Sequence, residues 1–195
     1  MDTINTSDSA EDSERRAALL KSIVDREQAM FVSVRSETPA SCQSELPAFR
    51  IHRFSQLCSW SVPTLDSYQQ DLQQAEDRQH NLMQRKYALM EQAADDRSIS
   101  PLVKRIVALQ VDWQNDLFQK YPEVASRGRK LDHDDGGSTS FRTYLQSELQ
   151  TYSDATLSLL YADMQACRAR SENWNELILL ATIRHQRQAD AGQIP

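Results

Sequence analysis

The sequence is poor in the residues that interrupt or cross-link a chain. Its 195 residues include only four Gly, six Pro and three Cys. So few helix breakers favour helices over strands joined by tight turns. The three cysteines, Cys42, Cys58 and Cys167, are odd in number, which argues against a disulfide framework. They also lack the spacing of a metal site. We therefore expect an all-α protein in a reducing, cytoplasmic setting.

The sequence also lacks long apolar runs and an excess of positive charge, which limits the partners that we expect. The longest apolar runs, such as residues 177–181, are far shorter than the roughly 20 residues that span a bilayer. The N-terminus also lacks the positive and apolar regions of a signal peptide. Positive charge is in deficit, because 28 acidic residues outnumber 22 Lys and Arg and give a net charge of −6. We expect no membrane and no nucleic-acid partner, since nucleic-acid binding needs basic patches; the oligomeric state is left open.

What the sequence does contain is apolar periodicity at three- and four-residue spacing. The first such stripe predicts a helix over residues 13–35 and consists of Leu20, Ile23, Val24, Met30, Phe31 and Val34. Glu27 stands in the middle of this stripe. An ionised Glu on the buried face of a helix is costly unless a partner neutralises it. Glu27 is therefore the first candidate for a functional or structural role.

The helical pattern repeats along the chain. Residues 49–81 align without a gap on residues 141–173, at an offset of 92, with identical residues at 11 of the 33 positions. The first helix repeats at an offset of 83, which pairs Ile23 with Ile106. We therefore predict about eight helices in two tandem four-helix repeats, packed about a pseudo-twofold axis into one compact bundle.

These patterns also set the predicted boundaries. Residues 1–12 are polar and acidic, and we expect a disordered tail there. A single helical domain is predicted over residues 13–186, with repeat one at 13–97 and repeat two at 98–186. Residues 187–195 form a second predicted tail.

The repeat extends Glu27 to a set of four polar residues on apolar stripes. The two offsets pair Glu27 with Gln110 and Gln56 with Glu148. A buried carboxylate without a partner has a raised pKa, which suits a general acid or base near neutral pH. We therefore expect a small-molecule enzyme that transfers protons in a cyclisation, isomerisation or elimination, such as one in a secondary-metabolite pathway. Its predicted catalytic residues are Glu27, Glu148 and His52.

Polar and aromatic residues on the same stripes are the predicted substrate-binding residues: Gln56, Gln110, Trp60, Tyr144, Tyr152, Trp113, Arg50 and Arg142. The two arginines recur in both halves and suit an anionic ligand, or salt bridges to Asp71, Asp163 or the core Glu residues.

Two alternatives stay open. In the first, the chain is a non-catalytic ligand-binding or assembly module, and the Glu and Gln residues hydrogen-bond each other to fix the register of the halves. A purely structural set would leave no pocket larger than a water molecule. In the second, Glu27, Glu148 and His52 hold a divalent metal. No other cofactor is expected.

Several motifs in the second half resemble one family. They include Ile106-Val107-x-x-Gln110-x-x-Trp113-Gln114 and Thr139-Ser140-Phe141-x-x-Tyr144-Leu145-x-x-Glu148-Leu149. A further motif in the first half is Ala40-Ser41-Cys42-Gln43. The sequence is similar to the domain of unknown function 4125 family of bacteria and fungi, over about residues 15–186. Because that family has no agreed reaction, the resemblance implies boundaries and no activity.

Overall fold

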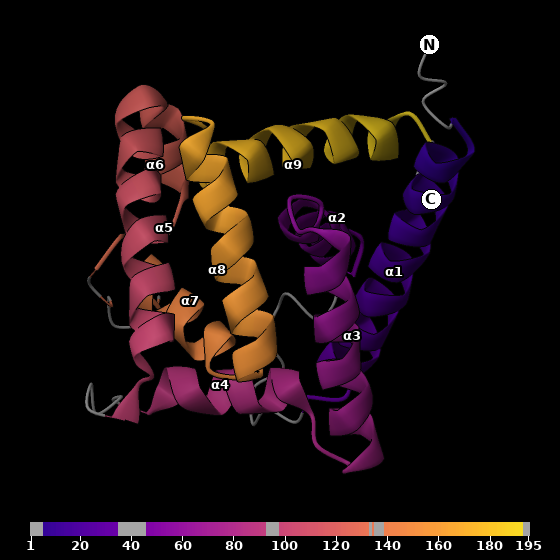
Figure 1. Cartoon of the computed structure of the whole chain (residues 1–195). Coiled ribbons are helices and arrows are strands. Elements are labelled where there is room, and N and C mark those ends of the chain that lie inside the picture. The colour runs from indigo at the N-terminus through magenta and orange to yellow at the C-terminus, as the bar shows by residue number, and fades with distance from the viewer. Residues whose placement is uncertain (1–5, 35–45, 93–97, 133, 135–138, 193–195) are drawn as a thin grey trace.

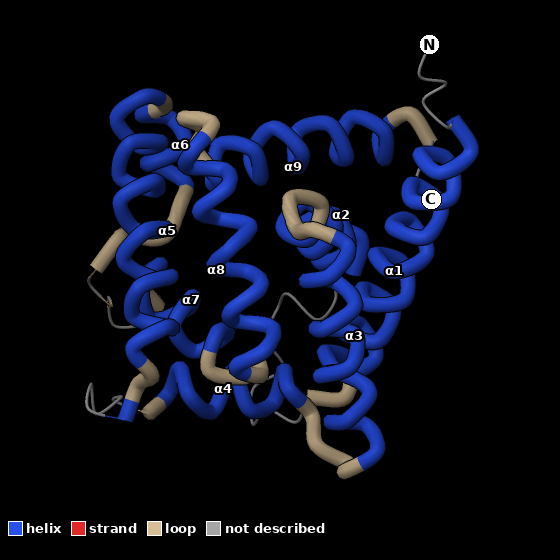
Figure 2. The backbone as a smooth tube through the Cα atoms, in the orientation of Figure 1, coloured by secondary structure: helices blue, strands red, loops and turns tan. Residues whose placement is uncertain are grey.

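The computed structural model describes residues 6–34, 46–92, 98–132, 134 and 139–192, and contains no strand within them (Figure 2). The predicted all-α class is confirmed. The motif around Cys42 lies outside the described residues. The helices are α1 (Thr6–Val32), α2 (Leu46–Leu57), α3 (Val62–Asp77), α4 (Leu82–Glu91), α5 (Pro101–Lys120), α6 (Pro122–Arg127), α7 (Phe141–Leu149), α8 (Asp154–Ala169) and α9 (Trp174–Asp190).

The helices differ from the predicted ones at two ends and by one additional helix. Helix α1 begins at Thr6, inside the segment predicted as a disordered tail, and α9 continues to Asp190, past residue 186. Once a helix has formed, each added residue gains a backbone hydrogen bond at little further entropy, so a polar sequence can extend it. The short helix α6 is additional to the predicted eight. It begins at Pro122, where the fixed φ of proline favours a first helical turn.

The helices form a frame around an inner pair (Figure 1). Helices α9 and α4 lie across opposite ends of the molecule, and α1 and α5 lie along its sides. Helices α3 and α8 pack against each other between them. Helix α2 packs on α1 and α9, whereas α7 packs on α5 and α4. Helix α2 of the first predicted repeat therefore contacts α9 of the second, and α4 of the first contacts α7 of the second.

Two carboxylates join the halves in a reciprocal way. The backbone N–H of Ser61, the N-cap of α3, donates to Asp163 Oδ2 on α8 at 2.9 Å. The backbone N–H of Ser153, the N-cap of α8, donates to Asp71 Oδ2 on α3 at 3.0 Å. Each helix thus supplies a carboxylate that accepts a hydrogen bond at the N-terminus of the other helix.

Other identical positions also make matching contacts. The Asn81 side chain donates to the carbonyl of Met30 at 2.7 Å, and the Asn173 side chain donates to the carbonyl of Trp113 at 2.8 Å. Both asparagines also cap the helix that follows them. This reciprocity favours the two-repeat arrangement, which stays a prediction about how the chain is organised.

The turns after α3 and α8 share one backbone conformation. Gln79 and Ser171, paired by the offset of 92, both have positive φ, at 56° and 57°. In each turn the N–H of the next residue closes a bond to a carbonyl five positions back, from His80 to Ala75 and from Glu172 to Cys167. This is the closure of a Schellman motif, where glycine is the usual residue.

The core contains ionised side chains as well as apolar ones. Most buried residues belong to one hydrophobic cluster that spans both halves. Glu27 lies among them with no exposed surface, and Arg53 is 2% exposed. None of the helices in the described part of the chain has the length and hydropathy of a membrane span. The buried charges lead to the candidate site.

Candidate functional site

Arg53 is the partner of Glu27. Its Nε donates to Glu27 Oε2 at 2.7 Å, and its Nη2 pairs with Glu27 Oε1. The Tyr68 hydroxyl on α3 donates to the same Oε1 at 2.6 Å. This two-pronged pair with an added hydroxyl satisfies both carboxylate oxygens. The buried charge on α1 is therefore neutralised inside the first half of the chain.

The same arginine reaches the second half. Arg53 Nη1 donates to Glu148 Oε1 on α7 at 2.6 Å. Lys86 Nζ on α4 donates to Glu148 Oε2 at 2.6 Å, and the Tyr152 hydroxyl donates to Oε1 at 2.7 Å. Glu27, Arg53, Lys86 and Glu148 form what we call the ion cluster. Its two positive and two negative charges balance.

The pKa of Glu148 follows from this cluster. Burial would raise the pKa of its carboxyl, but the positive charges of Arg53 and Lys86 outweigh burial and hold the pKa well below its usual range. Burial likewise acts to lower the pKa of Lys86, and the charge of Glu148 overrides it and raises that pKa. The predicted raised pKa is therefore wrong for Glu148, which is a poor proton donor at neutral pH.

The predicted metal site is disfavoured because Arg53 and Lys86 already occupy the carboxylates that would bind the metal. The carboxylate oxygens of Glu27 and Glu148 accept hydrogen bonds from Arg53, Lys86 and two tyrosines. Within the described residues, no group of three His, Cys, Asp or Glu side chains could hold a metal ion. Glu27, Glu148 and His52 do not form such a group, because cations take the place that a metal would need.

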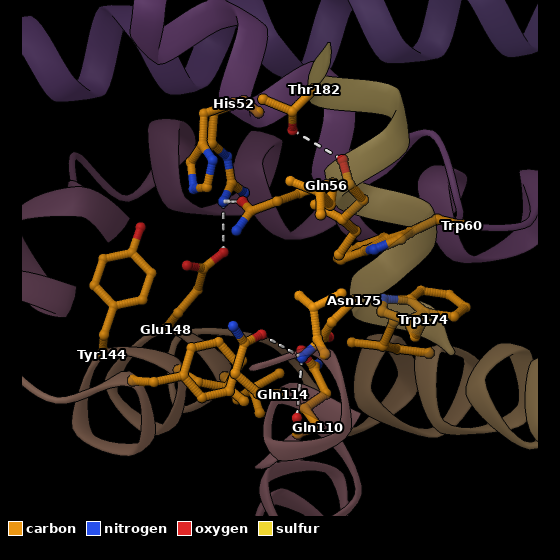
Figure 3. A pocket seen from close by; sticks show the side chains of 18 of the residues that line it. His52, Gln56, Trp60, Gln110, Gln114, Tyr144, Glu148, Trp174, Asn175 and Thr182 are labelled. Carbon is orange, nitrogen blue, oxygen red and sulfur yellow. Dashed lines mark hydrogen bonds and ion pairs between the residues drawn. The ribbon is translucent and has the colours of Figure 1, made fainter. Parts of the chain in front are cut away.

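A cavity of about 260 Å³ opens beside Glu148 (Figure 3). Helices α2, α5, α6, α7, α8 and α9 supply its walls, together with the turns that follow α2 and α7. Seven of the eleven predicted catalytic and substrate-binding residues line it: His52, Gln56, Trp60, Gln110, Tyr144, Glu148 and Tyr152. Most of the side chains that the repeat singles out therefore lie around one cavity, which opens beside Glu148 rather than between the two carboxylates.

Four predicted residues lie elsewhere. Glu27 is sealed behind Arg53, and Trp113 is buried in the hydrophobic core. Arg50 pairs with Asp25 at 2.7 Å, and Arg142 pairs with Asp132 at 2.5 Å. Neither arginine lines the cavity or pairs with a core Glu, Asp71 or Asp163. Both pair with an acid outside this cavity, so the cavity gives no support to their predicted role in ligand binding, which stays a prediction.

His52 keeps accessible surface in the cavity and is neutral. The surrounding protein displaces water from the ring and lowers its pKa from 6.5 to about 4, and the positive charge of Arg53 acts in the same direction. The ring makes no hydrogen bond to another described residue. Together with Gln56 and Tyr144, His52 also lines an adjoining recess of about 410 Å³.

Two amides in the cavity wall escaped the sequence reasoning as ligand-binding residues. Asn175 is 6% exposed, and its Nδ2 donates to the backbone carbonyl of Gln110 at 3.0 Å and to Gln114 Oε1 at 2.8 Å (Figure 3). Its Oδ1 is buried with no hydrogen-bond partner among the described residues. The repeat alignment held the signal, because it pairs Asn175 with Met83 and Gln114 with Phe31.

The ion cluster carried a similar signal. The offset of 92 pairs Arg53 with Leu145 and Lys86 with Ile178, so a cation in one half faces an apolar residue in the other. Both apolar residues line the cavity. Such mismatches between otherwise similar halves mark both the ion cluster and the amides.

Comparison with known proteins adds a family and no activity. The family model described as "Protein of unknown function (DUF4125)" matches residues 17–193. No curated protein and no solved structure matches the chain.

Proposed function

Because the chain belongs to the DUF4125 family, whose description specifies no activity, we propose from the cavity itself that the protein binds a small, uncharged, partly apolar molecule. The observation that carries the proposal is the cavity of about 260 Å³ beside the ion cluster, with aromatic and amide side chains in its walls. Concave sites with apolar walls and a few polar groups are the usual form of small-molecule sites.

The charge balance supports an uncharged ligand. Arg53 and Lys86 are matched by Glu27 and Glu148, so no charge of the cluster is left over for a ligand. A charged ligand would lose its hydration without gaining a free counter-ion in this cluster. The cavity walls instead offer apolar and aromatic surface from Trp60, Trp174 and Phe141, among others.

In this proposal Glu27 and Glu148 are structural. Their bonds hold α1, α2, α4 and α7 together, and Glu148 keeps the polar wall of the cavity in place. This is close to the ligand-binding alternative, with one difference. The Glu and Gln residues do not simply pair with each other, because Arg53 and Lys86 are inserted between them.

Binding of an uncharged fluorophore tests the proposal. Prodan, an uncharged naphthalene dye, changes its emission when it leaves water for an apolar site. We expect saturable binding to the full chain at one site. Thr182→Phe puts an aromatic ring into the cavity wall and should weaken binding at least tenfold, whereas the adjacent Ile183→Phe is the matched control because Ile183 is exposed and lies outside this cavity. Absence of saturable binding, or equal loss in both variants, would overturn the proposal.

A second candidate function is proton transfer on the bound molecule, and the neutral His52 favours it. A neutral imidazole exposed in a cavity can accept a proton, whereas the ionised Glu148 is tied to two cations. The test is deuterium incorporation from D₂O into a bound compound, followed by mass spectrometry. His52→Gln should abolish incorporation while binding persists; incorporation at the wild-type rate would reject this role.

A further inference from the structure

We infer that the ligand carries a neutral N–H and C=O pair, as in a primary carboxamide or a lactam, and that this pair is recognised by Asn175 and Gln114. The inference rests on the proposed function and specifies the class of molecule that the cavity takes. It depends on which atoms of these two amides are left without partners.

The hydrogen bonds fix the orientation of both amides. A backbone carbonyl can only accept, so the atom of Asn175 that lies 3.0 Å from the Gln110 carbonyl is the nitrogen, Nδ2. That nitrogen also donates to Gln114 at 2.8 Å, so the atom that receives it is the oxygen, Oε1. The free ends of the two side chains are therefore Asn175 Oδ1 and Gln114 Nε2.

These free ends form one acceptor and one donor on neighbouring side chains. Asn175 Oδ1 is buried without a partner, and Gln114 Nε2 donates to no other residue in the described part of the chain. Buried carbonyls in native proteins are almost always hydrogen-bonded. A ligand N–H on Oδ1 and a ligand C=O on Nε2 would satisfy both at once.

The fold does not need amides at these places. The repeat alignment pairs Gln114 with Phe31 and Asn175 with Met83. Phe31 is 3% exposed and Met83 is 5% exposed, so the first half packs apolar side chains at the paired positions. At these two pairs of positions the polar side chains belong to the second half, where both amides line the cavity wall.

The other walls suit the rest of such a molecule. Trp60, Trp174 and Phe141 offer aromatic surface to a flat ring, and the balanced ion cluster disfavours an ionised group. Because Oδ1 has almost no accessible surface, we expect the ligand to displace a neighbouring side chain slightly when it binds.

A pair of lactams that differ by one hydrogen-bond donor tests the inference. Carbostyril is a flat, uncharged lactam with a free N–H, and N-methylcarbostyril lacks that donor. We expect isothermal titration calorimetry on the full chain to give affinity for carbostyril about tenfold higher than for the methylated compound, as loss of one hydrogen bond to a buried group implies. Equal affinities for the two compounds would overturn the inference.

The first half supplies the matched variant. Asn175→Met introduces the residue that the alignment places at the equivalent position, and it should bring the two affinities within twofold of each other. Gln114→Met removes the donor for the ligand carbonyl, which both compounds carry, so it should weaken both affinities and leave the preference for carbostyril in place. A tenfold preference that persists in folded Asn175→Met, or unchanged affinities in folded Gln114→Met, would exclude recognition by this pair.

The outcomes separate this inference from the proposed function. If both lactams bind equally and prodan still binds, the cavity is a ligand site and the amide inference is wrong. If prodan and both lactams fail to bind, the proposed function itself fails.

Discussion

Two equivalent places in the molecule are built from similar helices and have opposite outcomes. In the first half Arg53 and Tyr68 both donate hydrogen bonds to Glu27, which has no exposed surface. The repeat alignment pairs these three residues with Gln110, Leu145 and Leu160, and all three of the latter line the cavity. Replacing a bonded charged set by one amide and two leucines removes both the charge and the volume that would fill the space. The first half therefore has a charged core at this place, whereas the equivalent place in the second half forms part of the cavity wall.

The comparison also separates stability from binding. The cations Arg53 and Lys86 belong to the first half and stabilise the one ionised residue, Glu148, that the second half contributes. The second half contributes the two amides whose free ends, Asn175 Oδ1 and Gln114 Nε2, have no partner among the described residues. Variants that exchange residues between equivalent positions should therefore affect either the free energy of unfolding or ligand affinity, depending on the half that is changed.

The largest effect should come from Arg53→Leu, which gives the first half the residue of the second. It leaves Glu27 buried without a cation and removes one cation from Glu148, so we expect a loss of about 4–5 kcal/mol in the free energy of unfolding. Urea unfolding measures it. The matched control is Arg142→Leu, whose ion pair with Asp132 is exposed and should contribute about 0–1 kcal/mol.

The double variant Glu27→Gln/Arg53→Leu tests the cause of that loss. It removes the orphaned charge and makes the set more similar to Gln110 and Leu145. We expect it to be more stable than Arg53→Leu alone. If the double variant were the less stable of the two, or if Arg53→Leu behaved like Arg142→Leu, the ion cluster would not be the source of stability.

Glu148→Gln should have the next largest effect, about 3 kcal/mol at pH 7, because Lys86 loses its buried partner. The effect depends on pH with a definite sign. The pKa of Glu148 in the folded state is below its usual value of 4.5, so the unfolded state binds more protons and the stabilisation is lost as pH falls. The difference between wild type and variant should therefore shrink as the pH is lowered from about 5. Unfolding curves measured over this range would contradict the assignment if the difference grew.

A smaller effect is expected where the halves are alike. Ser171 and Gln79 both adopt positive φ, which favours glycine. Ser171→Gly and Gln79→Gly should each raise the free energy of unfolding by about 1 kcal/mol, measured as a higher melting temperature. Ser158→Gly, in the exposed middle of α8, is the control and should lower it. A fall in both turn variants would show that these turns do not store strain.

The smallest effect concerns pH and ligand affinity. His52 has a pKa of about 4 and Glu148 is ionised, so neither changes charge between about pH 5.5 and 8. Carbostyril is uncharged in the same range. We therefore expect its affinity to change less than twofold, as measured by calorimetry at several pH values. A tenfold change would mean that a titrating group contacts the ligand.

The sequence predicted the helices well because their apolar spacing and serine caps are local signals. Glu27 stood out for the same reason, as a charge on an apolar stripe. Its partner did not, because Arg53 is a long side chain that reaches Glu27 and Glu148 only after three helices have packed. The sequence likewise could not show that Asn175 Oδ1 is left without a hydrogen-bond partner among the described residues. A cavity is space that side chains leave unfilled, and periodicity records only which residues face inward.

The reciprocal caps have a consequence for folding. Ser61 obtains its carboxylate from a residue 102 positions away, and Ser153 obtains its own from 82 positions away. The serine side chains cap α3 and α8 locally, but these carboxylate bonds form only when the two halves have packed, so each half depends on the other for them. Contacts of such long sequence separation slow folding and tie the chain into one transition. We expect either half expressed alone to be largely unfolded, and the two halves to gain structure only when they are mixed.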